Sequence, residues 1–193
     1  DPSHPRKAEL LAFYADNTIA IMQEFGYSKL EATKHVENII EFDALVAQYA
    51  NTSEEWAKYA ELYQPVSIEA FTSMITTLPV SDVIKTLIGK LPDKVIVYEK
   101  RIYDNFNHII NEANFERIKS WMLVKLLRSA THYLSDELRI LGSEFSRKLS
   151  GTAQARSQEK HAYDLATDQF SQAVGLYYGH KYFGESAKAD VKR

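Results

Sequence analysis

The sequence predicts an all-α fold, a helical bundle-like domain with at most one short strand or hairpin near residues 94–98. Only 7 glycines and 5 prolines interrupt the 193 residues, and the segments between them space their apolar residues as one helix face does. There is no cysteine, so neither a disulfide scaffold nor a thiolate zinc site can hold the fold. A chain of this length buries enough apolar surface without such links, so we expect a single helical domain over residues 1–193.

Apolar spacing and a capping signal predict the first two helices. Gly26 ends the first helix, and Ser28 with Glu31 forms a capping box that opens the second. The inward positions are Leu10, Tyr14, Ile21 and Phe25 in the first helix and Val36, Ile39, Val46 and Tyr49 in the second.

Shorter elements are expected in the middle of the chain. "NTSEEWAKYAELYQP" predicts a short helix that ends at Pro65. Two further short helices are expected to be capped by Ser67 and Ser81, and Gly89 closes the second of them. "KVIVY" at Lys94 to Tyr98 is rich in β-branched residues and predicts a strand, which must pair with another segment to be stable.

Long helices are predicted for the rest of the chain. They are expected from about Glu99 to Ala113, from about Phe115 to Tyr133, from the cap Ser135 to Gly151, and from about Ala153 to beyond Tyr177. The third of these places Leu138, Leu141, Phe145 and Leu149 inward.

Charge and hydropathy exclude several classes of partner. The formal net charge is only −3, and the basic residues are scattered, so we expect no nucleic-acid partner. No run of eighteen apolar residues occurs, and the start "DPSHPRKAEL" has no apolar signal core, so we expect no membrane partner and a bacterial cytoplasmic location. Both ends are expected to be cut, because the chain starts without Met and "ESAKADVKR" carries no helix stop signal.

Candidate metal ligands occur at two places. Glu31 and His35 lie four apart on a predicted helix, but two ligands do not make a zinc site, and an exposed i,i+4 pair is the favoured interpretation. His161, Asp164 and Asp168 share one helical face and leave open a small metal-dependent hydrolase. A solvated helix face is the favoured interpretation there too.

Aromatic residues and glycines gather near the end of the chain. We expect the rings to form core and interface rather than a platform for bases, since no basic groove accompanies them. Gly175 and Gly179 lie four apart and would let another helix approach closely, at a cost of about 1 kcal/mol each relative to alanine. The aromatic residues are Tyr163, Phe170, Tyr177, Tyr178, Tyr182 and Phe183.

Three blocks, in order along the chain, carry a resemblance to a known family. They are "VIVYEKRIYDNFNHIINE", "SWMLVKLLRSATHYLSDELRILGSEFSRKLSGT" and "AVGLYYGHKYFGESAK". From about Leu78 to the end, the sequence resembles the neprilysin family of zinc metalloendopeptidases, closest to the bacterial oligopeptidase O type. The earlier "DPSHPRKAELLAFYADNTIAIMQEFG" agrees more loosely, and "ARSQEKHAYD" lacks the Trp and Cys that many relatives carry there.

The resemblance implies a chain that contributes no catalytic residue and no metal ligand. In this family two histidines of an HExxH motif and a later glutamate hold zinc, and these motifs are absent from this sequence. The chain would then be a fragment of the helical lobe that encloses the active-site chamber and limits substrate size. Zinc would belong to the parent enzyme, and the partners would be the C-terminal catalytic lobe of the same parent chain and an oligopeptide substrate. The alternative is a stand-alone helical protein-interaction module without enzymatic activity.

Overall fold

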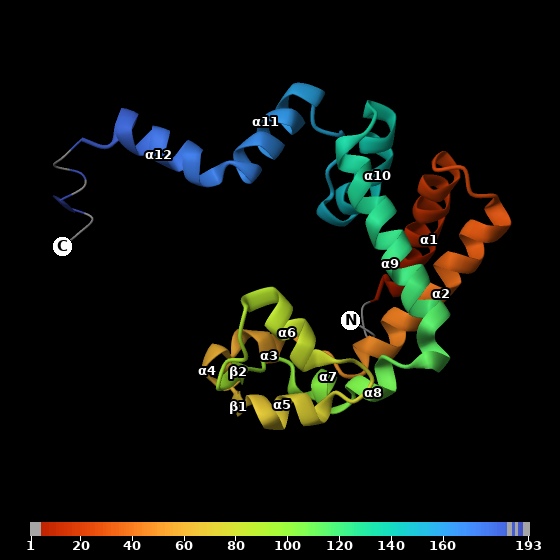
Figure 1. Cartoon of the computed structure of the whole chain (residues 1–193). Helices are drawn as coiled ribbons and strands as arrows, with labels where there is room; N and C mark the ends of the chain where they lie inside the picture. Colours follow the sequence, from red (N-terminus) through yellow and green to blue (C-terminus); the bar gives the residue numbers. More distant parts are fainter. Residues whose placement is uncertain (1–4, 185–186, 188, 191–193) are drawn as a thin grey trace. The chain divides into compact units, whose positions relative to one another are not determined.

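The computed structural model describes residues 5–184, 187 and 189–190. The chain divides into two compact units, Asp1–Phe145 and Ser146–Arg193 (Figure 1). Helices dominate both units, and within the described ranges the strands form one two-stranded sheet. The predicted all-α class is therefore confirmed, whereas the prediction of one domain over the whole chain stays a prediction.

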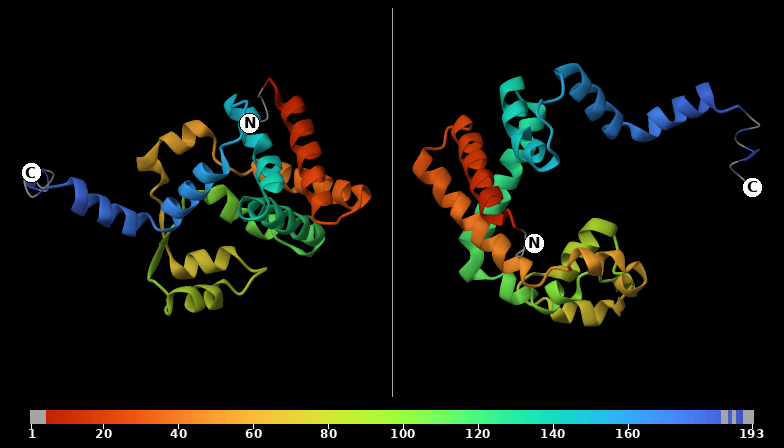
Figure 2. Two further views of the ribbon diagram at one scale, coloured as in Figure 1. Left: turned by 90° about the horizontal axis from the view of Figure 1, so that it is seen from above. Right: turned by 180° about the vertical axis from the view of Figure 1, so that it is seen from behind.

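Three helices form the core of the first unit. These are α1 (Lys7–Glu24), α2 (Lys29–Ala47) and α9 (Phe115–Ala130). The helix α9 returns from far along the sequence and lies beside α2 and α1, as Figures 1 and 2 both show. Solvent is fully excluded from four apolar side chains at the centre, Met22, Ala32, Ile39 and Val124.

The turn between α1 and α2 forms as local sequence signals predict. Gly26 has a φ of 91°, a conformation that glycine adopts without steric cost. The Ser28 Oγ accepts a hydrogen bond from the Glu31 N–H at 3.3 Å, and the Ser28 N–H donates to the Glu31 carboxylate at 2.9 Å. This reciprocal pair is the predicted capping box.

A smaller group of elements lies between α2 and α9. The predicted strand is confirmed in a shorter form as β2 (Lys94–Ile96), which pairs antiparallel with β1 (Pro65–Ser67). Ile68 and Val97, which directly follow the two strands, are buried, as is Leu62 shortly before β1. The elements around it are α3 (Ser53–Ala57), α4 (Tyr59–Leu62), α5 (Ile68–Met74), α6 (Val80–Ile88), α7 (Lys100–Asp104), α8 (Phe106–Ile109) and the 3-10 helix η1 (Glu112–Asn114).

The helix predicted from Glu99 to Ala113 is broken into shorter pieces. It splits at Asn105, whose side-chain amide donates to the Arg101 carbonyl at 2.9 Å. Asn111 then caps η1 by accepting from the Asn114 N–H. Asparagine side chains compete with the helix for backbone groups, and apolar spacing does not reveal that competition.

The predicted caps of the two short helices had different outcomes. Ser67 caps α5 by accepting from the Ala70 N–H at 3.2 Å, as expected. Ser81 does not cap α6, because the N–H groups of residues 82 and 83 donate to the Pro79 carbonyl and start the helix at Val80. Gly89 closes α6 with a φ of 80°, as predicted.

The helix expected over 51–65 is also broken. It is interrupted at Lys58, where ψ is 63°.

The helix α10 (Asp136–Ser150) follows α9 after the 3-10 turn η2 (Thr131–Tyr133). Its predicted cap is confirmed, since the Ser135 Oγ accepts from the Leu138 N–H at 3.3 Å. Gly151 ends the helix with a φ of 69°. The inward placement of Leu149 is wrong, because that side chain is 56% exposed.

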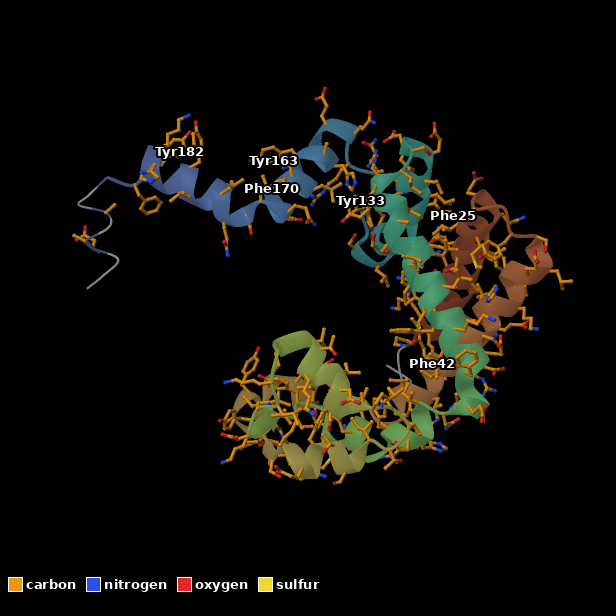
Figure 3. All side chains as sticks on the ribbon, viewed as in Figure 1. Phe25, Phe42, Tyr133, Tyr163, Phe170 and Tyr182 are labelled. Atoms are coloured by element: carbon orange, nitrogen blue, oxygen red, sulfur yellow. The ribbon has the colours of Figure 1, made fainter. Side chains whose placement is uncertain are left out.

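In the second unit, the described residues up to 184 form two short helices where one long helix was predicted. These are α11 (Gln158–Gln169), capped by Ser157, and α12 (Ser171–Tyr182). The predicted helix from Ala153 is wrong at its start and at Phe170, where φ is −111° and ψ is 30°. The labelled rings of Tyr163 on α11, Phe170 between the two helices and Tyr182 on α12 are all exposed (Figure 3).

Candidate functional site

His35 takes part in a contact between helices rather than in a metal site. Its Nδ1 lies 2.9 Å from the Ser120 Oγ on α9, and the Asn38 amide donates to the same oxygen at 3.0 Å. The hydroxyl proton of Ser120 goes to the Glu116 carbonyl at 2.8 Å, so His35 must donate through Nδ1–H. The interpretation of an exposed i,i+4 pair with Glu31 is therefore wrong for His35, which is half-buried.

The His35–Ser120 contact also lacks the geometry of a nucleophile and its base. A nucleophilic serine needs its proton to point at the base, whereas the Ser120 hydroxyl donates to a backbone carbonyl. Ser120 is also only 1% exposed, which leaves no room for a substrate at its oxygen. The contact therefore fixes α2 against α9.

Glu31 is engaged in helix capping. Hydrogen bonds from Ser28 lower the pKa of the Glu31 carboxyl. Neither side chain of the Glu31–His35 pair therefore turns toward a shared ion.

The residues His161, Asp164 and Asp168 do not form a metal site. Asp164 makes ion pairs with Lys160, at 2.9 Å, and with Arg156, and the Lys160 hydrogen bond is the largest cause that lowers the pKa of Asp164. Across the part of the chain that the structure describes, no group of three His, Cys, Asp or Glu side chains could hold a metal ion. These three side chains therefore do not fit a zinc ion.

The aromatic residues of α12 contact one another on the surface. The rings of Tyr178 and Tyr182 lie 4.9 Å apart, and Lys181 lies over the rings of Tyr177 and Tyr182 at 5.5 and 5.4 Å. No atom lies within 4 Å of a methyl group built on Gly175 or Gly179. The expected close approach of another helix is therefore not met among the described residues.

A polar network around Arg128 was not anticipated from the sequence. The Arg128 guanidinium donates to the Asn17 Oδ1 at 3.0 Å and the Thr18 Oγ1 at 2.9 Å, and it lies 4.9 Å from the Tyr14 ring centroid. The Asn17 amide continues to the Leu141 carbonyl at 2.9 Å. Burial lowers the pKa of Arg128 and raises that of Tyr14. The network joins α1, α9 and α10, and its role is structural.

An apolar pocket of about 600 Å³ lies beside the start of α9. The loop after α5 forms one wall, and Asn107 holds that loop by accepting from the Thr76 and Thr77 N–H groups and donating to the Met74 carbonyl. No spacing signal in the sequence joins these walls, which lie about thirty residues apart. The lining residues are Thr77, Leu78, Phe106, Ile110, Asn111, Glu112, Phe115 and Ile118.

The family profile of peptidase family M13 matches residues 1–193. The chain belongs to peptidase family M13. This assignment confirms the resemblance to neprilysin-like zinc metalloendopeptidases, and it applies to the N-terminal part of that family's sequence. The profile spans the segment before Leu78 as well, where the resemblance was looser.

Relatives of this M13 chain agree in sequence and in fold. A neutral endopeptidase of Lactococcus lactis subsp. lactis (strain IL1403) is 53% identical over 190 residues, which cover 98% of this chain and 30% of the relative. The crystal structure of PepO from Lactobacillus rhamnosis HN001 (DR20) is 30% identical with a TM-score of 0.87, over 98% of this chain and 30% of that one. The zinc metalloprotease Zmp1 of Mycobacterium tuberculosis, 20% identical over the same shares, matches in fold with a TM-score of 0.85.

This M13 chain thus spans about 30% of the length of the relatives that it matches. Among its described helices, none has both the length and the apolar character that a bilayer crossing requires.

Proposed function

We propose that this chain is the non-catalytic N-terminal helical portion of a zinc metalloendopeptidase that hydrolyses oligopeptides. In the parent protein it helps to enclose the active-site chamber and limits the size of the peptides that reach the metal. The C-terminal catalytic lobe of the same parent chain is its partner, and zinc belongs to that lobe.

One observation carries the proposal: the M13 profile matches the whole chain, while the chain spans only 30% of its neutral endopeptidase relative. The described residues supply helices and a polar network but no metal-binding group. Restriction of access is a function that packed helices perform without reacting groups, because it depends on which substrates reach the site.

The test uses the complete reading frame that contains this chain. We expect the parent protein to cleave oligopeptides, to lose that activity with a chelator and to recover it with zinc, while residues 1–193 alone stay inactive. A series of peptides of increasing length, compared with an unfolded protein, measures the size limit. A parent without chelator-sensitive cleavage would contradict the proposal, and a reading frame that stops soon after Arg193 would favour the stand-alone interaction module.

The bacterial cytoplasmic location is a second part of the proposal. Its bacterial part is supported by relatives such as the neutral endopeptidase of Lactococcus lactis, which matches 98% of this chain. Fractionation of cells that express the complete reading frame would test it, and recovery outside the cytoplasmic fraction would contradict it.

A further inference from the structure

The hydrogen-bonding pattern of the β1–β2 hairpin (Figure 1) determines which of its backbone groups point outward. Val97, which directly follows β2, donates its N–H to the Gln64 carbonyl at 3.0 Å. Hydrogen-bonded and non-hydrogen-bonded positions alternate along an antiparallel pair, so Val95 bonds to β1 and its two neighbours do not. The N–H and C=O groups of Lys94 and Ile96 therefore point away from β1.

These outward groups form an open edge on β2. Among the described residues, none forms a hydrogen bond with the N–H or C=O groups of Lys94 and Ile96, and Ile96 is 44% exposed. The opposite edge of the hairpin carries Pro65, which has no N–H to donate. The open edge ends at Tyr98, whose carbonyl accepts from the Asn51 side-chain amide at 3.1 Å. We call the outward backbone groups of Lys94 and Ile96 the β2 edge.

The side chains along the β2 edge give it a chemical preference. Lys94 and Ile96 share the outer face of the hairpin, because successive side chains of a strand alternate between its faces. The inner face carries Val97, which is only 2% exposed. The Lys94 ammonium is exposed and forms no ion pair with a described residue, so it is available to a carboxylate. Ile96 offers an apolar contact beside it.

We infer that the β2 edge binds an extended peptide that carries an apolar residue and, two positions later, an acidic residue. The peptide adds to β2 as an antiparallel third strand. Its apolar residue lies opposite Ile96 and its acidic residue opposite Lys94, because an antiparallel strand passes Ile96 first. Both of these peptide residues exchange N–H···O=C bonds with β2, whereas the N–H of the residue between them points away from the hairpin.

The inference rests on the proposed function, because it takes an oligopeptide as the occupant and assigns to it a site and a sequence preference. A second copy of the chain fits the β2 edge less well. Antiparallel pairing of two β2 edges either places the two Lys94 side chains opposite or diagonal to each other, as like charges, or uses the Tyr98 carbonyl, which Asn51 already engages. A lysine on an edge strand also discourages pairing between copies.

The test measures peptide binding to the complete parent protein. Acetohydroxamate, a small metal chelator that leaves zinc in place, is added to stop cleavage, and fluorescence anisotropy of a short labelled peptide with the central sequence Leu-Ala-Glu gives the Kd. N-methylation of the leucine or of the glutamate removes a hydrogen-bond donor to β2, so we expect about tenfold weaker binding. N-methylation of the alanine between them is the matched control and should change the Kd by less than about twofold.

Charge reversal on the hairpin tests the preference for an acidic residue. Lys94→Glu should weaken binding of the glutamate peptide by about tenfold and favour a peptide with lysine in its place. Lys90→Glu is the control variant, because Lys90 is also exposed and lies in the loop before β2 rather than on the edge. It should leave both Kd values unchanged. Circular dichroism confirms that each variant folds.

Four results would overturn the inference. Equal affinities of all the N-methylated peptides would show that the peptide does not pair as a strand, and equal effects of Lys94→Glu and Lys90→Glu would reduce the preference to net charge. Loss of peptide binding as the parent self-associates would assign the edge to a second copy, and the absence of binding by any of the peptides would leave the edge without a ligand. A parent that binds with the expected pattern but cleaves no peptide would contradict the proposed function and leave this inference standing.

Discussion

The substitution Gly142→Ala tests how closely α10 approaches the turn after α9. A methyl group on Gly142 would lie 2.1 Å from the Thr131 Oγ1 and 2.7 Å from the Thr131 Cβ. Thr131 is fully buried, and its hydroxyl donates to the Arg128 carbonyl at 2.7 Å. Rotation of the threonine side chain would move Oγ1 but not Cβ, so the backbones of α10 and η2 must separate.

The expected net effect is a loss of about 2 kcal/mol of unfolding free energy. Overpacking of this kind costs roughly 3 kcal/mol at the upper end of its usual range, and the gain of alanine over glycine within a helix returns about 1 kcal/mol. For a chain of this size such a loss lowers the melting temperature by roughly 4–8 °C. Thermal and urea unfolding, followed by circular dichroism, measure both quantities.

Gly175→Ala provides the matched control, because Gly175 lies inside α12 with no atom within 4 Å of the added methyl group. It has the same helix-propensity gain without the clash, so we expect no loss of stability. Thr131→Ala removes two of the three close atoms, so the double variant should be more stable than the sum of the single effects by about 1 kcal/mol. The reasoning is refuted if Gly142→Ala unfolds at the same temperature as the unsubstituted chain or above it.

Three further substitutions test the core, an ion pair and the buried polar network. Ile39→Ala should cost about 2–5 kcal/mol in urea unfolding, because Ile39 is fully buried, whereas Leu30→Ala should change stability by less than about 0.5 kcal/mol; similar losses would contradict the core assignment. Hydrogen bonds from Arg101 hold the pKa of the Glu55 carboxyl at about 2, below its ordinary 4.5, so Glu55 stabilises the fold above pH 4.5 and loses that effect as pH falls through about 2. Glu55→Gln should therefore lower the urea midpoint at pH 7 and match the unsubstituted chain below pH 2, and a difference that does not shrink toward low pH would contradict this. Arg128→Met should cost about 2 kcal/mol by leaving two oxygens without their charged donor, Arg128→Lys should restore part of it, and equal stability of all three proteins would argue against the network.

Elements with local causes could be predicted from the sequence. The Ser28–Glu31 capping box and the Gly89 terminus are set by residues within one turn of each other, and both are confirmed. The β2 strand also has a local signal, although its partner β1 does not. Long helices were wrongly predicted where a polar side chain competes for backbone hydrogen bonds. At Asn105, for example, the side-chain amide donates to the Arg101 carbonyl.

The contacts that join distant segments could not be predicted in this way. His35 and Ser120 are 85 residues apart, and Arg128 and Asn17 are 111 apart. Spacing places such residues on a helix face but gives no information about which helix that face meets. The sequence therefore pairs His35 with its neighbour Glu31, and it does not reveal the network around Arg128. The family resemblance identified the family of the chain, but it predicted no contact between particular residues.

The two faces of α9 illustrate the same limit within one helix. Phe115, Met122 and Leu126 can be placed on one face from the sequence, and Val124 on the opposite face, but the sequence cannot show which face the chain itself covers. The structure resolves this, because Val124 is fully buried and the other three side chains are exposed.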